Sequence, residues 1–147
     1  MREIKFRAWD KTGKRMGEVN YIRYSNVQYN QVSARFKQNE KTVDEWFNYG
    51  DKDGCDNIIL MQYTGLKDRK GKDIFEGDIV AEGTINYVVA FYAGAWRLKQ
   101  NIDGDTWRKS LYRYVIDRKL KVIGNIYENP EFLKEDKIDA NWKTKIR

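Results

Sequence analysis

Histidine is absent from the 147 residues, and the chain contains one cysteine, Cys55, and one proline, Pro130. Without histidine, the usual Ser–His and Cys–His pairs of nucleophilic catalysis are excluded, and the commonest general base and metal ligand are missing. A single cysteine excludes a disulfide within the chain and a cysteine-based zinc site. We therefore expect a protein that is not an enzyme, with no catalytic residues, no metal and no cofactor.

Long apolar runs are absent as well. The chain begins with charged residues, and no stretch approaches the roughly 18 apolar residues that a membrane span needs. Neither Gly-x-x-x-x-Gly-Lys-Ser/Thr nor Gly-x-Gly-x-x-Gly occurs, so these two routes to nucleotide binding are disfavoured. We expect a cytoplasmic protein with no membrane partner.

Aromatic residues are abundant, at 14% of the chain, and they favour strands because they suit half-buried pleated surfaces. Residues 2–9 alternate between apolar and charged side chains, which predicts a strand. Asp10–Lys14 is typical of a tight turn, with Gly13 able to take a positive φ. An extended pattern resumes over residues 16–22, so residues 1–24 are predicted to form a β-hairpin.

Residues 42–49 allow two interpretations. Val43, Trp46 and Phe47 are spaced as in a short helix, which Thr42 would cap. A strand running through Phe47 and Tyr49 fits equally well, and the pattern alone does not decide between them. The acidic run that follows, Asp51–Gly54, is predicted to be a turn and not a calcium loop, because its glycine is at the wrong position.

The second half of the chain contains several short apolar runs separated by Gly and Asp turns. These runs are residues 58–63, 79–80, 84–92, 96–98, 110–116 and 120–127. Strands at this spacing are typical of a small barrel or a curled sheet. Gly77-Asp78 predicts a tight bend, in which Asp78 accepts hydrogen bonds from turn amides.

The predicted fold is mainly β (α+β), in three parts. Residues 1–57 form an N-terminal β-rich lobe, residues 58–130 a small barrel, and residues 131–147 a helical tail. Pro130 fits the first turn of a helix with Asn129 as its cap. In the tail, Ile138, Trp142 and Ile146 recur every four residues, which predicts one apolar helical face. That face either docks on the parent barrel or contacts a second subunit.

The formal net charge is +6, and basic and aromatic residues are interleaved over residues 92–121. Cations bind phosphates through counterion release, and exposed rings stack on bases. We predict a nucleic-acid-binding surface made by Tyr92, Trp96, Arg97, Lys99, Trp107, Arg108, Tyr112, Arg113, Arg118 and Lys121. The alternative is a protein-binding or self-assembly module, whose partner is a second copy or another protein, because aromatic residues and arginine are also enriched at protein interfaces.

Three segments carry a family resemblance: REIKFRAWD at residues 2–10, LMQYTGLKD continuing through GKDIFEGDIV at residues 60–80, and VIGNIYENPE at residues 122–131. They resemble the YopX family of phage and prophage proteins. The resemblance implies an SH3-like β-barrel in the C-terminal part and an origin in a bacterial host cell. It implies no established activity and no site residues. For the protein-binding alternative, it implies that the partner is a second copy or a phage or host protein.

Overall fold

A computed structural model describes residues 1–26, 29–50, 57–100 and 109–133 of the chain. The protein is mainly β, with antiparallel strands in two sheets, and divides into two compact units, Met1–Tyr63 and Thr64–Arg147. The boundary predicted between residues 57 and 58 lies at the start of β5 (Ile58–Lys67), a strand that runs from the first unit into the second. The predicted turn at Asp51–Gly54 and the tail beyond residue 133 lie outside the described residues.

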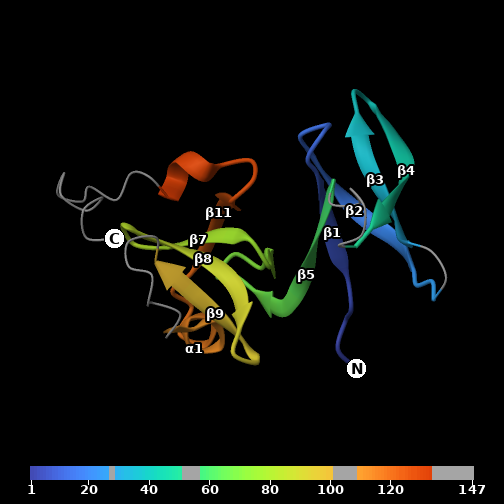
Figure 1. Ribbon diagram of the computed structural model, residues 1–147. Coiled ribbons are helices and arrows are strands. Elements are labelled where there is room, and N and C mark those ends of the chain that lie inside the picture. Colours follow the sequence, from blue (N-terminus) through green and yellow to red (C-terminus); the bar gives the residue numbers. More distant parts are fainter. Residues whose placement is uncertain (27–28, 51–56, 101–108, 134–147) are drawn as a thin grey trace, which may run out of the picture. The chain divides into compact units, whose positions relative to one another are not determined.

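The first unit is an antiparallel sheet, seen in Figure 1. Its strands are β1 (Phe6–Asp10), β2 (Arg15–Arg23), β3 (Asn30–Gln38), β4 (Lys41–Tyr49) and the first part of β5, in the order β4-β3-β2-β1-β5. The hairpin predicted for residues 1–24 is confirmed by β1 and β2. Residues 42–49 are a strand, since β4 pairs with β3 along its whole length, and the helical interpretation with Thr42 as cap is wrong.

One face of this sheet carries the core of the first unit. Ala8, Ala34, Phe36 and Ile58 are buried there, and the ring of Phe47 meets that of Phe36 edge-to-face at a centroid distance of 5.9 Å. Gly17 lies opposite Ala8 in the register. A Cβ at Gly17 would lie 2.7 Å from the Phe36 ring and 2.8 Å from a backbone oxygen. Only glycine therefore allows β2 to pass beside Phe36.

The turn between β1 and β2 forms where it was predicted, but its conformation differs. The positive φ of 50° belongs to Lys14, so the prediction for Gly13 is wrong. Gly13 is needed for a close approach instead, because a Cβ there would lie 2.5 Å from Oδ2 of Asp10.

The second unit contains a five-stranded sheet in the order β10-β9-β8-β7-β11, and β6 lies next to β5. The bounds are β6 (Asp73–Phe75), β7 (Asp78–Glu82), β8 (Ile85–Tyr92), β9 (Ala95–Gln100), β10 (Lys109–Ser110) and β11 (Lys121–Asn125), with helix α1 (Leu111–Ile116) and the 3-10 helix η1 (Pro130–Leu133). The strands predicted over residues 58–63, 79–80, 84–92, 96–98 and 120–127 are confirmed. The bend predicted at Gly77-Asp78 is also confirmed, and there Oδ2 of Asp78 accepts a hydrogen bond from the Phe75 amide at 2.8 Å.

The strand predicted over residues 110–116 is wrong, because residues 111–116 form α1. Leu111, Tyr114 and Val115 are spaced at three and four residues, and all three meet the core from one side of the helix. The apolar run therefore has a helical period, which the strand prediction overlooked.

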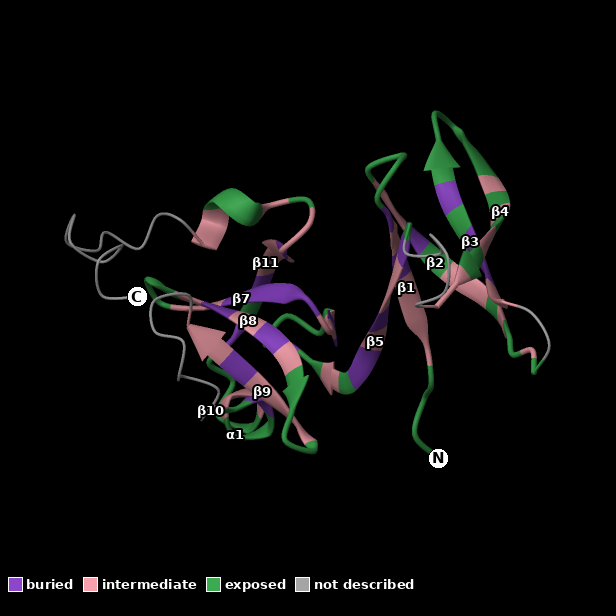
Figure 2. Cartoon of the chain, in the orientation of Figure 1, coloured by how far each residue is buried: buried purple, intermediate pink, exposed green. Residues whose placement is uncertain are grey.

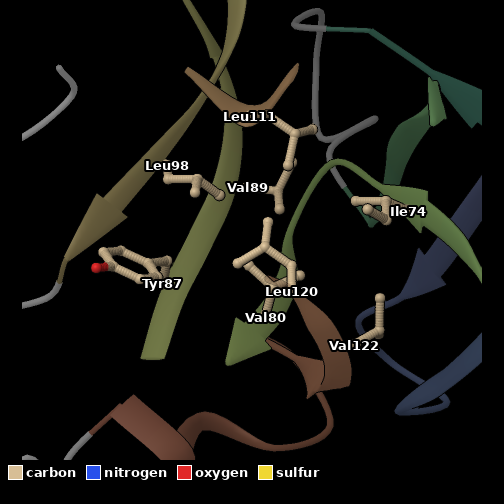
Figure 3. Packing of buried hydrophobic residues seen from close by; sticks show 8 residues of the cluster. All are labelled: Ile74, Val80, Tyr87, Val89, Leu98, Leu111, Leu120 and Val122. Carbon is tan, nitrogen blue, oxygen red and sulfur yellow. The ribbon is translucent and has the colours of Figure 1, made fainter. Parts of the chain in front are cut away.

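The core of the second unit lies on one face of its sheet, hereafter the inner face. Figure 3 shows the buried cluster, and along β8 buried side chains alternate with less buried ones (Figure 2). The members are Ile74, Val80, Tyr87, Val89, Leu98, Leu111, Leu120 and Val122. Since Leu111 comes from α1, the helix covers the inner face.

The predicted helix start at Pro130 is confirmed only as the short helix η1. Asn129 does not cap it with its side chain. The Asn129 Oδ1 accepts a hydrogen bond from the Asn125 amide at 3.3 Å and so ties η1 back to β11. In the described part of the chain, no helix has the length and apolar character that crossing a membrane requires.

We expect Gly17→Ala to lower the free energy of unfolding by about 2 kcal/mol, because the added methyl group overlaps the Phe36 ring and the β3 backbone. Urea denaturation followed by tryptophan fluorescence measures the loss. Lys37→Ala, at an exposed position of β3, is the control and should change stability by less than about 0.5 kcal/mol. Equal stability of G17A and the wild type would contradict the close approach of Gly17 to the Phe36 ring.

Candidate nucleic-acid interface

Two charged segments of the second unit, far apart in sequence, are joined by backbone hydrogen bonds. The amide of Arg69 donates to the carbonyl of Leu120 at 3.0 Å, and the amide of Val122 donates to Oδ2 of Asp68 at 2.9 Å. The turn after β5 therefore lies against the connection from α1 to β11. Six exposed cations come from these two segments, and we call them the basic cluster: Arg69, Lys70, Lys72, Arg118, Lys119 and Lys121.

Asp68 shapes the first segment of the basic cluster. Its Oδ1 accepts hydrogen bonds from the amides of Lys70, at 2.8 Å, and Lys72, at 2.9 Å, and its backbone closes the turn with Gly71 and Lys72. Aspartate suits this place because its short side chain reaches amides two to four residues ahead. These hydrogen bonds fix the backbone of the turn. The side chains of Arg69, Lys70 and Lys72 are exposed to solvent.

The same sequence pattern, Asp-x-x-Gly-Lys, also forms a turn in the first unit, but its backbone differs: the left-handed residue is Lys14 there and Gly71 in the second unit. Oδ1 of Asp10 accepts hydrogen bonds from the amides of Thr12 and Gly13, at 3.1 and 3.0 Å. The second carboxylate oxygen has a different kind of partner in the two turns. Oδ2 of Asp10 accepts a hydrogen bond from Nε of the nearby Arg15 at 2.9 Å, whereas Oδ2 of Asp68 accepts one from the Val122 amide. The β1–β2 turn is therefore anchored within its own hairpin, whereas the turn at Asp68 is anchored to a distant strand.

The charge of Asp68 is stabilised by backbone amides. Burial raises the pKa of this carboxyl group, but hydrogen bonds from the amides of Val122, Lys72 and Lys70 outweigh it and hold the pKa below its ordinary value. Asp68 stays ionised and directs its oxygens to the backbone. Its hydrogen bonds go to backbone amides, and the side chains of the basic cluster are exposed at the surface.

The second segment begins where α1 ends. The amide of Lys119 donates to the carbonyl of Tyr114 at 3.1 Å, and the amide of Arg118 donates to that of Val115 at 3.0 Å. This is the Schellman arrangement, in which the residue past the helix takes a left-handed conformation and is usually glycine. Here it is Arg118, with a φ of 52°. A non-glycine residue in this conformation costs about 1 kcal/mol, and such strain often marks a functional position.

The structure divides the surface predicted over residues 92–121 between two faces of the sheet. Arg97 pairs with Ala90, and Lys99 with Val88, in positions that alternate with the core pair Val89–Leu98. Tyr92, Arg97 and Lys99 therefore lie on the outer face, opposite the core. Trp96 lies on the inner side, where it packs against the core and its ring meets that of Phe91 edge-to-face at 5.1 Å.

Tyr112 and Arg113 are exposed on α1, which covers the inner face. They lie on the other side of the sheet from the outer-face residues. Arg118 and Lys121 are the two predicted residues that belong to the basic cluster. Trp107 and Arg108, like Ile138, Trp142 and Ile146, lie outside the described residues.

The predicted binding surface did not include Arg69, Lys70 and Lys72. Three cations within four residues were a visible signal. What no local pattern revealed was the hydrogen bond from Val122 to Asp68, which spans 54 residues and brings the two segments together.

One ring near the basic cluster, that of Tyr114, is engaged with the protein. The ammonium of Lys119 lies 5.6 Å from the ring centroid of Tyr114, a residue that is half-buried against the core. The cluster therefore offers cations for phosphate more clearly than it offers rings for bases. Within the described ranges, no group of three Cys, Asp or Glu side chains is placed to hold a metal ion.

Comparison with known proteins identifies the family. The family model described as YopX protein matches residues 5–134, nearly the whole chain. The chain belongs to the YopX family. The crystal structure of protein EF1440 from Enterococcus faecalis is similar, with a TM-score of 0.62 and 24% sequence identity over 90% of this chain and 99% of that one. At this identity the likeness shows the fold alone, and no curated protein matches the sequence.

We expect Asp68→Asn to lower the free energy of unfolding at pH 7 by about 2 kcal/mol, since one amide oxygen cannot replace two carboxylate oxygens. The folded-state pKa of Asp68 is lowered, so its stabilisation is complete above the unfolded value of about 3.9 and is lost as the pH falls through the folded value. The gap between wild type and D68N should therefore narrow as the pH falls below about 4. Urea unfolding at neutral pH and at several pH values below about 4 measures the gap, with the exposed Asp117→Asn as control. A gap independent of pH would refute this role.

We expect Arg118→Gly to raise the free energy of unfolding by about 0.5 kcal/mol, because glycine adopts the left-handed conformation without the steric cost. Thermal unfolding measures the gain. Arg118→Lys removes the guanidinium but keeps the Cβ, and it should leave stability unchanged. R118G less stable than R118K would show that the arginine is not strained.

Proposed function

We propose that this YopX-family protein is a non-catalytic binding protein that contacts the phosphate backbone of nucleic acid through the basic cluster. The observation that supports this most is the joining of two lysine- and arginine-containing segments by the Arg69–Leu120 and Val122–Asp68 hydrogen bonds. Phosphates gain affinity for such a cluster because each contact releases condensed counterions. Six cations on one ordered site are enough for several simultaneous contacts.

The ordered backbone supports the proposal further. Both segments are fixed by amide hydrogen bonds, so little chain entropy is lost when phosphate binds. Two acidic residues beside the cluster have hydrogen-bond partners outside it: Asp68 binds backbone amides, and Asp73 binds Nζ of Lys67 at 2.5 Å. With six cations against Asp68 and Asp117, the two segments keep a net positive charge.

The expected specificity follows from the side chains. Lysine and arginine contacts to phosphate position a protein on nucleic acid but carry no sequence information. We therefore expect similar affinity for unrelated sequences of equal length. The outer-face residues Tyr92, Arg97 and Lys99 make a second, separate candidate for contact with a single strand, since they combine an exposed ring with two cations.

Three finer features of the family resemblance belong to the same proposal. The five-stranded sheet of the second unit, with its core on one face, is compatible with an open form of an SH3-like barrel. We also place the protein in the cytoplasm of a bacterial host and assign it a phage or prophage origin. These features rest on the resemblance and on a single cysteine.

The two Asp-x-x-Gly-Lys turns supply a matched test. We expect the double variant Lys70→Gln/Lys72→Gln to weaken binding to a duplex oligonucleotide, and to lower the slope of log affinity against log salt by roughly 1.8. Lys11→Gln/Lys14→Gln removes the same charge from the β1–β2 turn and should leave the slope unchanged. Fluorescence anisotropy between about 50 and 200 mM salt measures both.

Two results would refute the proposal. The first is no detectable binding of the wild type to single- or double-stranded oligonucleotides near 50 mM salt, where phosphate contacts are strongest. The second is an equal loss in the two double variants, which would show that net charge alone matters and that the basic cluster is not the site.

A further inference from the structure

The first unit exposes an ordered face on β2, β3 and β4, on the side opposite its core. Strand pairing arranges its side chains in three rows across the strands. The rows are Glu18–Arg35–Asp44, then Tyr21–Ser33–Trp46, then Arg23–Gln31–Asn48. We call this surface the three-row face, and the three strands that carry it lie side by side in Figure 1.

The middle row is aromatic and exposed. Tyr21 and Trp46 are 66% and 51% exposed, and their rings lie nearly parallel, 17° apart, with centroids 6.2 Å from each other. Between them Ser33 is only 2% exposed. Exposed tryptophan and tyrosine at the centre of a face, with charged side chains around them, are typical of an interaction surface.

The outer rows are held in place before any partner arrives. Arg35 makes two hydrogen bonds to Asp44, at 2.8 and 3.1 Å, and hydrogen bonding to Arg35 lowers the pKa of Asp44. The Arg23 guanidinium lies 5.1 Å from the Trp46 ring and donates to Gln31 Oε1 at 3.2 Å. Ordered side chains lose little entropy on binding, which favours association.

The charges of the three-row face balance. Arg23 and Arg35 are offset by Glu18 and Asp44, so the face attracts neither a polyanion nor a polycation. Such a surface complements another surface with the same mixture of signs. The closest available match is the same face on a second copy of the chain.

Symmetry decides how two copies would meet. A two-fold axis along the strands places Glu18 opposite Asp44 of the second copy and Arg35 opposite its own equivalent, so like charges face each other. A two-fold axis across the strands, through the middle row, exchanges the outer rows. This axis places Glu18 of each copy opposite Arg23 of the other, which gives two equivalent pairs. It also places the Trp46 ring opposite the Trp46 ring of the second copy.

We propose that the three-row face binds the same face of a second copy around the two-fold axis that crosses the strands. Two reciprocal Glu18–Arg23 pairs flank the central rings, and Arg35 and Asp44 meet the amides of Gln31 and Asn48. This association uses residues of the first unit alone, and it is independent of the nucleic-acid proposal for the basic cluster.

The area of the three-row face limits the affinity of the association. Three strands about 4.8 Å apart, each contributing about five residues of length, cover a few hundred Å². This is well below the roughly 800 Å² that each partner of a stable complex buries. We therefore expect reversible association at protein concentrations on the order of 100 μM or above.

Charge reversal tests the pairing directly. We expect Glu18→Arg alone and Arg23→Glu alone each to weaken association at least about tenfold, because each places like charges opposite one another. The double variant E18R/R23E restores opposite charges and should return to within about threefold of the wild type. Sedimentation equilibrium between about 10 μM and 1 mM measures the dissociation constant.

Two exposed residues near the β3–β4 turn provide controls with the same change in net charge. Glu40→Arg and Lys41→Glu lie beyond the three rows and should associate as the wild type does. A monomer at every concentration up to 1 mM would overturn the proposal, as would failure of the double variant to recover. Recovery cannot come from a different partner of the face, because only a second copy carries the compensating change.

Discussion

The second unit depends on one carboxylate that accepts hydrogen bonds from two parts of the chain at once. Asp68 binds the amides of its own turn through Oδ1 and the amide of Val122 through Oδ2. Because Val122 is also a core residue of β11, the same contact fixes a surface turn to the buried cluster. Asp68 thus ties its own turn to the start of β11, and the hydrogen bond from Arg69 to Leu120 adds a second link beside it.

The comparison with Asp10 shows what the local sequence determines and what it leaves to the rest of the chain. Both aspartates use Oδ1 to accept hydrogen bonds from two amides of their own turn, although the two turns differ in backbone conformation. The second oxygen takes whatever donor the fold supplies: the Arg15 side chain in one unit and the Val122 amide in the other. Identical motifs can therefore end in different surroundings, and only one of them joins two charged segments.

The sequence predicted most strands because alternation and turn residues are local signals. It left residues 42–49 open because Trp46 and Phe47 fit both periods, and pairing with β3 decides the matter. It misassigned residues 111–116, where the helical spacing of Leu111, Tyr114 and Val115 is the informative signal. For the candidate site it found Arg118 and Lys121 but placed them with Trp96, a residue that the register turns toward the core. The long-range bond from Val122 to Asp68 had no local signature at all.

The ionised Asp68 also has a consequence for behaviour in acid. The lysines and arginines around it stay protonated as the pH falls, and the chain has no histidine to add charge near neutrality. Acidification would therefore leave the positive charge of this surface intact while loosening the contact that sets its spacing. Affinity for a polyanion would then decline through lost geometry, in a pH range where simple electrostatics predicts that it should grow.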